Sequence, residues 1–202
     1  MALASTFNLG TLGAATLPIR FTVEQYHRMI QTGVLREDQR VELLEGWIVP
    51  KMPHNPTHDS AIDLLVGEMS PFLPADWFLR VQSAITMVDS EPEPDIAAVR
   101  GPRGRYSTTH PTAADIGMLV EVADTSLAND RNVKGPLFAV ARIPYYWIVN
   151  LPERRVEFHS EPSGPDSAPG YRQVRVYTPD QAIPLFLDGT ELGRIEVARI
   201  LP

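Results

Sequence analysis

The chain has 202 residues and no cysteine, so disulfide bonds, zinc–thiolate sites and cysteine nucleophiles are excluded. It also lacks an apolar run of about 18 residues, the length that a membrane-spanning helix needs. No lysine or arginine precedes Arg20, whereas a secretory signal begins with basic residues. We therefore expect a cytoplasmic protein with no membrane association, in which residues 1–19 form a flexible leader.

Positive charge is also scarce, and the formal net charge is −7 at pH 7. A protein that coats DNA without specificity is expected to be basic, so that class is disfavoured. A nuclease with a local basic groove stays open, because binding depends on the field near the site. The chain has no G-x-S-x-G nucleophile elbow and no glycine-rich phosphate-binding motif, so serine hydrolases and nucleotide-cofactor enzymes have no support.

Hydrophobic periodicity and turn residues predict both helices and strands. Thr22 and Gln25 form a capping-box pattern at the start of a helix that ends at Gly33, and Glu45-Gly46 marks a hairpin turn. Further helices are predicted at 57–72 and from about 130 onward, and strands within 77–88, 95–99, 116–123, 144–150, 154–160 and from 171 onward. The length suits one domain, placed at residues 20–202, and the element order predicts an α/β or α+β domain around a mixed sheet.

Two carboxylates lie in or beside strands that read as buried. Asp95 follows Pro94 at the start of one strand, and Glu121 lies inside the apolar run 118–122 of another. A buried charge is costly unless it is paired or bound to a metal, so Glu121 indicates an ion pair or a metal site. If the two strands are neighbours, both carboxylates converge on one point that suits Mg²⁺, which prefers hard oxygen ligands. Asp95 taken alone could simply be a turn residue and cap.

Lys134 is the only lysine between residues 52 and 202, in a chain whose cations are nearly all arginine. Beside a metal site, a lysine could orient or help deprotonate the attacking water and stabilise charge on a phosphate. The alternative is a solvated lysine on the face of a helix.

The loop at 99–110 carries Arg100, Arg103 and Arg105, and no acidic residue occurs between Ile96 and Ala114. A loop that contacts DNA phosphates beside a metal would have this composition. A solvated basic loop would have it as well, so both interpretations stay open.

Five stretches in a fixed order resemble the Uma2 (DUF820-type) family of endonucleases, a branch of the PD-(D/E)XK restriction-endonuclease-like superfamily. They are VELLEGWIV, PTHDSAI, EPDIAAV, VEVADTSLANDRNVK and IPYYWIVN, and the resemblance extends from about residue 21 to 195. It implies a restriction-endonuclease-like mixed β-sheet flanked by helices, with additional β-hairpins. It also implies hydrolysis of DNA phosphodiester bonds with Mg²⁺ or Mn²⁺.

The resemblance assigns roles to individual residues. Pro94-Asp95 resembles the "PD", and Glu121 resembles the acidic residue of the second half-motif, which makes Asp95 and Glu121 the implied metal ligands. Ala123 stands where the family pattern usually has its lysine, and in this branch Lys134, on the following helix, is taken to replace it.

Three further residues are implied or expected at the same site. Glu42 matches an upstream acidic position that helps hold a metal or orient the lysine, and His58 matches a histidine on the second helix. Asp130 is expected to support the site or to favour the helix dipole. One departure is Gly135-Pro136 inside the helix, since a proline biases the preceding residue away from helical geometry and puts the reach of the lysine in question.

Three functions follow as hypotheses. The first is a metal-dependent DNA endonuclease, and the second is a catalytically silent fold kept as a binding or dimerisation module. The third is a hydrolase of another phosphoester. A homodimer is compatible with the first two, so dimerisation would not distinguish them.

Overall fold

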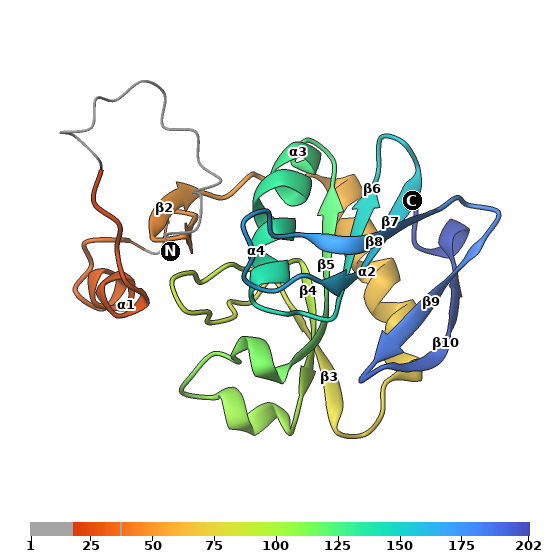
Figure 1. Cartoon of the computed structure of the whole chain (residues 1–202), viewed down its shortest axis with the longest axis horizontal. Coiled ribbons are helices and arrows are strands. Elements are labelled where there is room, and N and C mark those ends of the chain that lie inside the picture. Colours follow the sequence, from red (N-terminus) through yellow and green to blue (C-terminus); the bar gives the residue numbers. More distant parts are fainter. Residues whose placement is uncertain (1–17, 37) are drawn as a thin grey trace.

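A six-stranded mixed sheet forms the centre of the molecule, in a computed structural model that describes residues 18–36 and 38–202 (Figure 1). In spatial order the strands are β3 (Trp77–Val81), β4 (Ile96–Arg100), β5 (Ile116–Ala123), β6 (Tyr145–Asn150), β7 (Arg155–Pro162) and β8 (Tyr171–Tyr177). Among the strands of this described sheet, only β5 and β6 pair in parallel, and a helical crossover joins them. This confirms the predicted fold class. The leader predicted at 1–19 lies, up to residue 17, outside the described residues, and the single domain at 20–202 stays a prediction.

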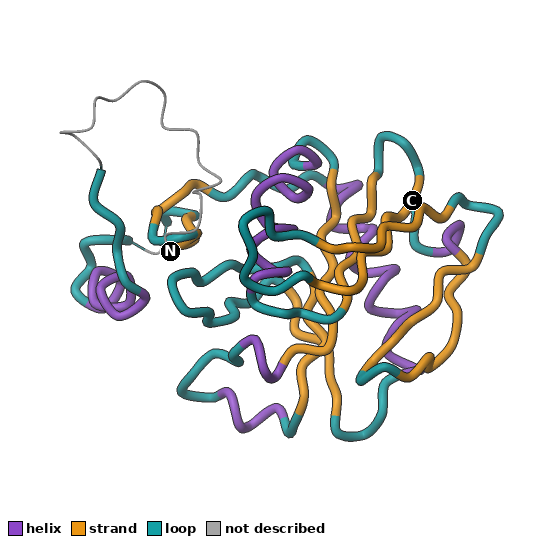
Figure 2. The backbone as a smooth tube through the Cα atoms, viewed as in Figure 1, coloured by secondary structure: helices purple, strands orange, loops and turns teal. Residues whose placement is uncertain are grey.

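Helical and hairpin layers cover the two faces of this sheet (Figures 1 and 2). One face packs against α2 (Pro56–Met69) and the hairpin formed by β9 (Ala182–Leu187) and β10 (Thr190–Glu196). The other face packs against the helical run α3 (Leu127–Asn129), η4 (Asp130–Lys134) and α4 (Gly135–Val140). Strand β5 is buried along its whole length, as a strand covered on both faces must be. Among the described residues, no helix has the length and apolar character needed to cross a membrane.

The N-terminal helix and hairpin follow the sequence prediction closely. Helix α1 (Val23–Gln31) begins with the capping box of Thr22 and Gln25, and β1 (Val41–Leu44) turns into β2 (Trp47–Pro50) through Glu45-Gly46. Both turn residues have positive φ, 48° and 79°, which a tight two-residue hairpin turn requires. The N–H of Glu91 donates to the carbonyl of Leu43 at 2.7 Å, which fixes β1 against the segment that leads into β4.

Two predicted elements are shorter than expected. The segment predicted as one or two strands at 77–88 contains only β3, and the residues up to 94 form a loop with isolated bridges. The second helix ends at Met69 and continues as a 3₁₀ turn over Ser70–Phe72, because Pro71 supplies no N–H for a further α-helical hydrogen bond.

The helix after β5 continues through Gly135-Pro136 because one of its turns is wide. The N–H of Gly135 donates to the carbonyl of Asp130, five residues earlier, so η4 is a π-turn between two α-helical segments. Such a turn holds one residue more than an α-helical turn. In a regular α-helix the ring of Pro136 would clash with the carbonyl four residues earlier, and the wider turn changes the position of that carbonyl. Lys134 is the last residue of this wide turn.

An ion pair fastens the wide turn to the sheet. Arg131 Nε donates to Glu157 Oε2 on β7 at 3.0 Å. Burial opposes ionisation of this carboxyl, yet His159 and the Arg131 guanidinium lower the pKa of Glu157 to about 2 from 4.5. Because the folded pKa is the lower one, the pair stabilises fully above about pH 4.5, and this contribution is lost as the pH falls toward 2.

We expect Glu157→Gln to lower the free energy of unfolding by about 1–2 kcal/mol at pH 7, allowing for a half-exposed arginine partner. The variant should also lose less stability than the wild type as the pH falls from about 5 to 3. Urea unfolding at several pH values measures both effects. Glu153→Gln, which removes the exposed partner of Arg155, serves as the control and should change stability by less than about 0.5 kcal/mol. Parallel pH curves for the wild type and Glu157→Gln would contradict the prediction.

Candidate active site

A pocket of about 300 Å³ lies where β5 approaches its end and β4 begins. Six of the nine residues singled out from the sequence line it: Glu42, His58, Asp95, Glu121, Asp130 and Lys134. They come from β1, the first turn of α2, the residue before β4, strand β5 and the π-turn. Segments far apart in the sequence therefore meet at one edge of the sheet.

Asp95 and Glu121 face each other across neighbouring strands. Ile96 pairs with Val120, so one further step of this antiparallel register places Asp95 opposite Glu121. Residues in such positions have Cβ atoms about 4.5–5.5 Å apart. Asp95 Oδ2 also accepts a hydrogen bond from the N–H of Val122 at 2.8 Å, which holds its carboxylate against β5. The convergence expected from the sequence is thus present in the fold.

Lys134 lies in the same buried cluster. Its Nζ donates to Glu121 Oε1 at 2.8 Å and lies 3.8 Å from Glu42 Oε1. The other oxygen of Glu42, Oε2, accepts a hydrogen bond from the N–H of Glu93 at 3.1 Å. Burial by itself would lower the pKa of Lys134, but the charges of Glu121, Glu42 and Asp130 raise it. The ammonium group therefore stays protonated and acts as a donor.

Negative charge is in excess in the pocket. Burial raises the pKa of Glu121 well above its usual value, Lys134 opposes this, and the charges of Asp95 and Asp130 add to the rise. Burial likewise raises the pKa of Asp130 to about 6, although Lys134 and the hydroxyl of Ser126, 2.6 Å from Asp130 Oδ2, act against it. Several buried carboxylates around one ammonium group make a site that a divalent cation would stabilise.

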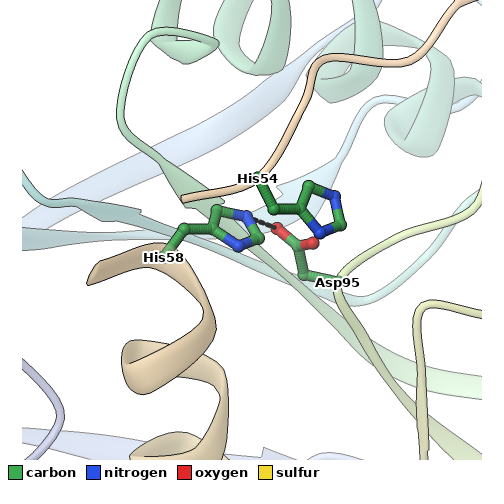
Figure 3. Close-up of side chains that lie close together, drawn as sticks. All are labelled: His54, His58 and Asp95. Atoms are coloured by element: carbon green, nitrogen blue, oxygen red, sulfur yellow. Dashed lines mark hydrogen bonds and ion pairs between the residues drawn. The ribbon is translucent and has the colours of Figure 1, made fainter. Parts of the chain in front are cut away.

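Two histidines lie on the other side of Asp95. Figure 3 shows the imidazoles of His54 and His58 directed toward its carboxylate. His58 Nε2 lies 3.2 Å from Asp95 Oδ2, and the two rings stack with centroids 4.5 Å apart. Burial would raise the pKa of Asp95, but the hydrogen bond and charge of His58 and the N–H of Val122 lower it. Conversely, burial would lower the pKa of His58, but Asp95 raises it.

The sequence analysis missed His54. One ligand atom from each of His54, His58 and Asp95 lies within 4.8 Å of the others, so the three side chains could hold a metal ion. The signal in the sequence was the pair of histidines four residues apart, on either side of the Asn55-Pro56 helix start. Only the folded loop between β2 and α2 brings His54 beside Asp95.

The three arginines predicted to contact DNA lie away from the pocket. Arg100 ends β4 while Asp95 precedes it, which separates them by about 16 Å at 3.3 Å per strand residue. Arg100 forms ion pairs with two aspartates, Arg105 Nη2 lies 3.0 Å from Asp115 Oδ1, and Arg103 stacks over the ring of Phe78. Their contact with DNA stays a prediction. None of the three arginines lines the pocket.

Comparison with known proteins agrees with this arrangement. The chain superimposes with a TM-score of 0.63 on a crystal structure from Anabaena variabilis described as a putative nuclease belonging to DUF820, which shows that the fold is shared. The match covers 91% of this chain and 97% of the other at 13% sequence identity. No protein with curated function matches. The family model Uma2, described as "Putative restriction endonuclease", matches residues 23–196, and the chain therefore belongs to the Uma2 family.

Proposed function

We propose that the protein is a metal-dependent endonuclease that hydrolyses phosphodiester bonds of DNA. The observation that carries this proposal is the buried Lys134–Glu121 pair, which lies in one pocket with Asp95. A protonated lysine buried beside converging carboxylates has a clear use in phosphodiester hydrolysis, where negative charge must be stabilised. The family description names restriction endonucleases, and DNA is the substrate that such enzymes cut.

Asp95 and Glu121 would hold a divalent ion, Mg²⁺ or Mn²⁺, in this proposal. Their oxygen atoms suit such an ion, and the excess of carboxylates in the pocket supports its binding. The bound ion would supply Lewis acidity and lower the pKa of a coordinated water. A phosphate would be repelled by the carboxylates alone, so activity should depend strictly on added metal.

Lys134 would hold the attacking water and donate to a phosphate oxygen. Its raised pKa makes it a poor proton acceptor, so its contribution is positive charge and orientation. Glu42, 3.8 Å from the ammonium group, would position it, and Asp130 would add to the field that keeps it protonated. His58 would fix the carboxylate of Asp95 through their contact of 3.2 Å.

Nicking of supercoiled plasmid in Mg²⁺ or Mn²⁺ tests this function. We expect the wild type to cut only with added metal, and Glu121→Gln, which keeps the shape of the side chain, to lose at least about 100-fold in rate. Glu153→Gln, on the exposed turn after β6, is the matched control and should cut normally. Equal cleavage by wild type and Glu121→Gln would assign the activity to another site or to a contaminant.

The net charge of −7 favours one alternative, a catalytically silent fold kept for binding or dimerisation. Such a protein would leave plasmid intact and gain no thermal stability from divalent ions, whereas a metal-binding nuclease gains stability by mass action. A homodimer and a cytoplasmic location stay predictions under both functions.

A further inference from the structure

We propose that the pocket is a transition-metal site, in which His54 and His58 join Asp95 as ligands and give preference to Co²⁺ or Zn²⁺ over Mg²⁺. The proposal rests on the proposed function only in sharing Asp95 with it, and it concerns which ions the protein binds. It differs from the two-carboxylate Mg²⁺ site that the family resemblance implies.

The three donor groups already form a compact set. One ligand atom of each lies within 4.8 Å of the other two. Nitrogen and oxygen ligands on one transition-metal ion are at most about 4.2 Å apart, twice the usual bond length of about 2.1 Å. Small side-chain rotations would therefore close the set around an ion.

Imidazole nitrogen decides the class of ion. Mg²⁺ takes hard oxygen ligands and gives up water reluctantly, whereas imidazole suits the later first-row divalent ions, from iron to zinc. Two histidines beside one carboxylate are a donor set of the second kind. Both face the pocket, and His58 and Asp95 are buried within it.

Lys134 donates to Oε1 of Glu121 at 2.8 Å, so this oxygen is engaged on the lysine side of the pocket. The hydrogen bonds to Asp95 go to Oδ2, from the N–H of Val122 and from Nε2 of His58, whose proton is released to solvent when that nitrogen binds an ion. Among the described residues, none donates a hydrogen bond to Oδ1 of Asp95, so this atom is available on the side of the histidines. Asp95 can therefore bind an ion through Oδ1 together with the two histidines.

A carboxylate orients the ring of His58, as is usual for histidine ligands of metals. Asp59 Oδ1 lies 3.4 Å from Nδ1 of His58, on the opposite side of the ring from the nitrogen that faces Asp95. For His54, the amide nitrogen Nε2 of Gln82 lies 2.9 Å from Nδ1 of the ring. Arg40 Nη2 lies 3.3 Å from Nε2 of the same ring, and since Arg40 is exposed it can move into solvent when an ion binds.

Metal titration of the metal-free protein tests the proposal. We expect Co²⁺ and Zn²⁺ to bind at least about 10-fold more tightly than Mg²⁺, and bound Co²⁺ to show visible absorption bands of a site with nitrogen ligands. His54→Gln should weaken Co²⁺ binding at least about 10-fold and change that spectrum while leaving Mg²⁺ binding within about threefold. His58→Gln provides a second variant, and circular dichroism confirms that both are folded.

His110→Gln is the matched control, because His110 lies outside this pocket. It should bind Co²⁺ as the wild type does. Equal affinity of the wild type for Mg²⁺ and Co²⁺ would overturn the proposal, as would a Co²⁺ spectrum that neither His54→Gln nor His58→Gln changes. Cobalt bound through both histidines by a protein that leaves plasmid intact would support this inference and reject the nuclease function, so the two proposals fail separately.

Discussion

Lys134→Met is expected to abolish plasmid cleavage while the protein keeps its response to divalent ions. Methionine fills much of the same volume, but it removes the ammonium group that lies 2.8 Å from Glu121 Oε1. If that group stabilises charge on the phosphate, the cleavage rate should fall about 100- to 1000-fold. Metal binding should persist or strengthen, because the carboxylates lose the cation that competes with the ion for Glu121.

The same variant should be less stable than the wild type without metal. Removing one partner of a buried ion pair costs about 3–5 kcal/mol, and protonation of Glu121 would relieve part of that cost. Added Mn²⁺ should then restore stability, which thermal unfolding with and without the ion measures. Recovery of thermal stability on adding Mn²⁺ distinguishes a lysine that acts in catalysis from one that only stabilises the fold.

Lys51→Met is the control for loss of a lysine at the pocket. Lys51 pairs with Glu93 in the lining of the pocket, and its removal should change the cleavage rate by less than about threefold. Wild-type cleavage by Lys134→Met would rule out the proposed role of the lysine. Loss of both cleavage and the metal response would mean instead that the pocket had collapsed.

Asp95→Asn should remove the stabilisation that divalent ions give to the folded protein. The amide can still accept the hydrogen bond from Val122, so the shape of the site should persist while its charge is lost. At an ion concentration of 100 times Kd the wild type gains about 2.7 kcal/mol by mass action, and the variant should gain close to none. The cleavage rate should fall by at least about 1000-fold, since both proposed ligand sets contain Asp95.

Histidine titration gives an independent check on this variant. The negative charge of Asp95 raises the pKa of His58, so its removal should lower that pKa. NMR of the imidazole protons measures the change. Asp188→Asn, which removes an exposed partner of Arg100 away from the pocket, should leave the pKa of His58 and the metal response unchanged. An unchanged metal response in Asp95→Asn would place the ion elsewhere.

The parts of the site that could be predicted from sequence depend on local patterns. The apolar run that surrounds Glu121 predicts a buried strand, and a carboxylate inside such a strand predicts a charged partner. Lys134 follows on the next helix, and the parallel β5–β6 pair requires that helix to cross back over the sheet. The resemblance to Uma2 supplied the mixed sheet flanked by helices and the additional hairpins.

The parts that were missed depend on contacts between distant segments. His54 lies on a loop whose path is set by its packing beside Asp95, about 40 residues further along the chain. Arg100 was predicted beside the pocket, but its strand runs away from Asp95, and its aspartate partner Asp188 comes from the C-terminal hairpin. The composition of the loop predicts neither the direction in which Arg100 points nor its ion pair with Asp188.

The wide turn that ends at Lys134 has a consequence for how this family can diverge. A helix acquires such a turn when a single residue is inserted, and one residue corresponds to a rotation of about 100° around the helix axis. Insertion or deletion of a single codon is therefore enough to rotate the lysine side chain into the pocket or out of it, while the strands stay in place. Gain and loss of an active site would then be separated by one small genetic event, without loss of the fold.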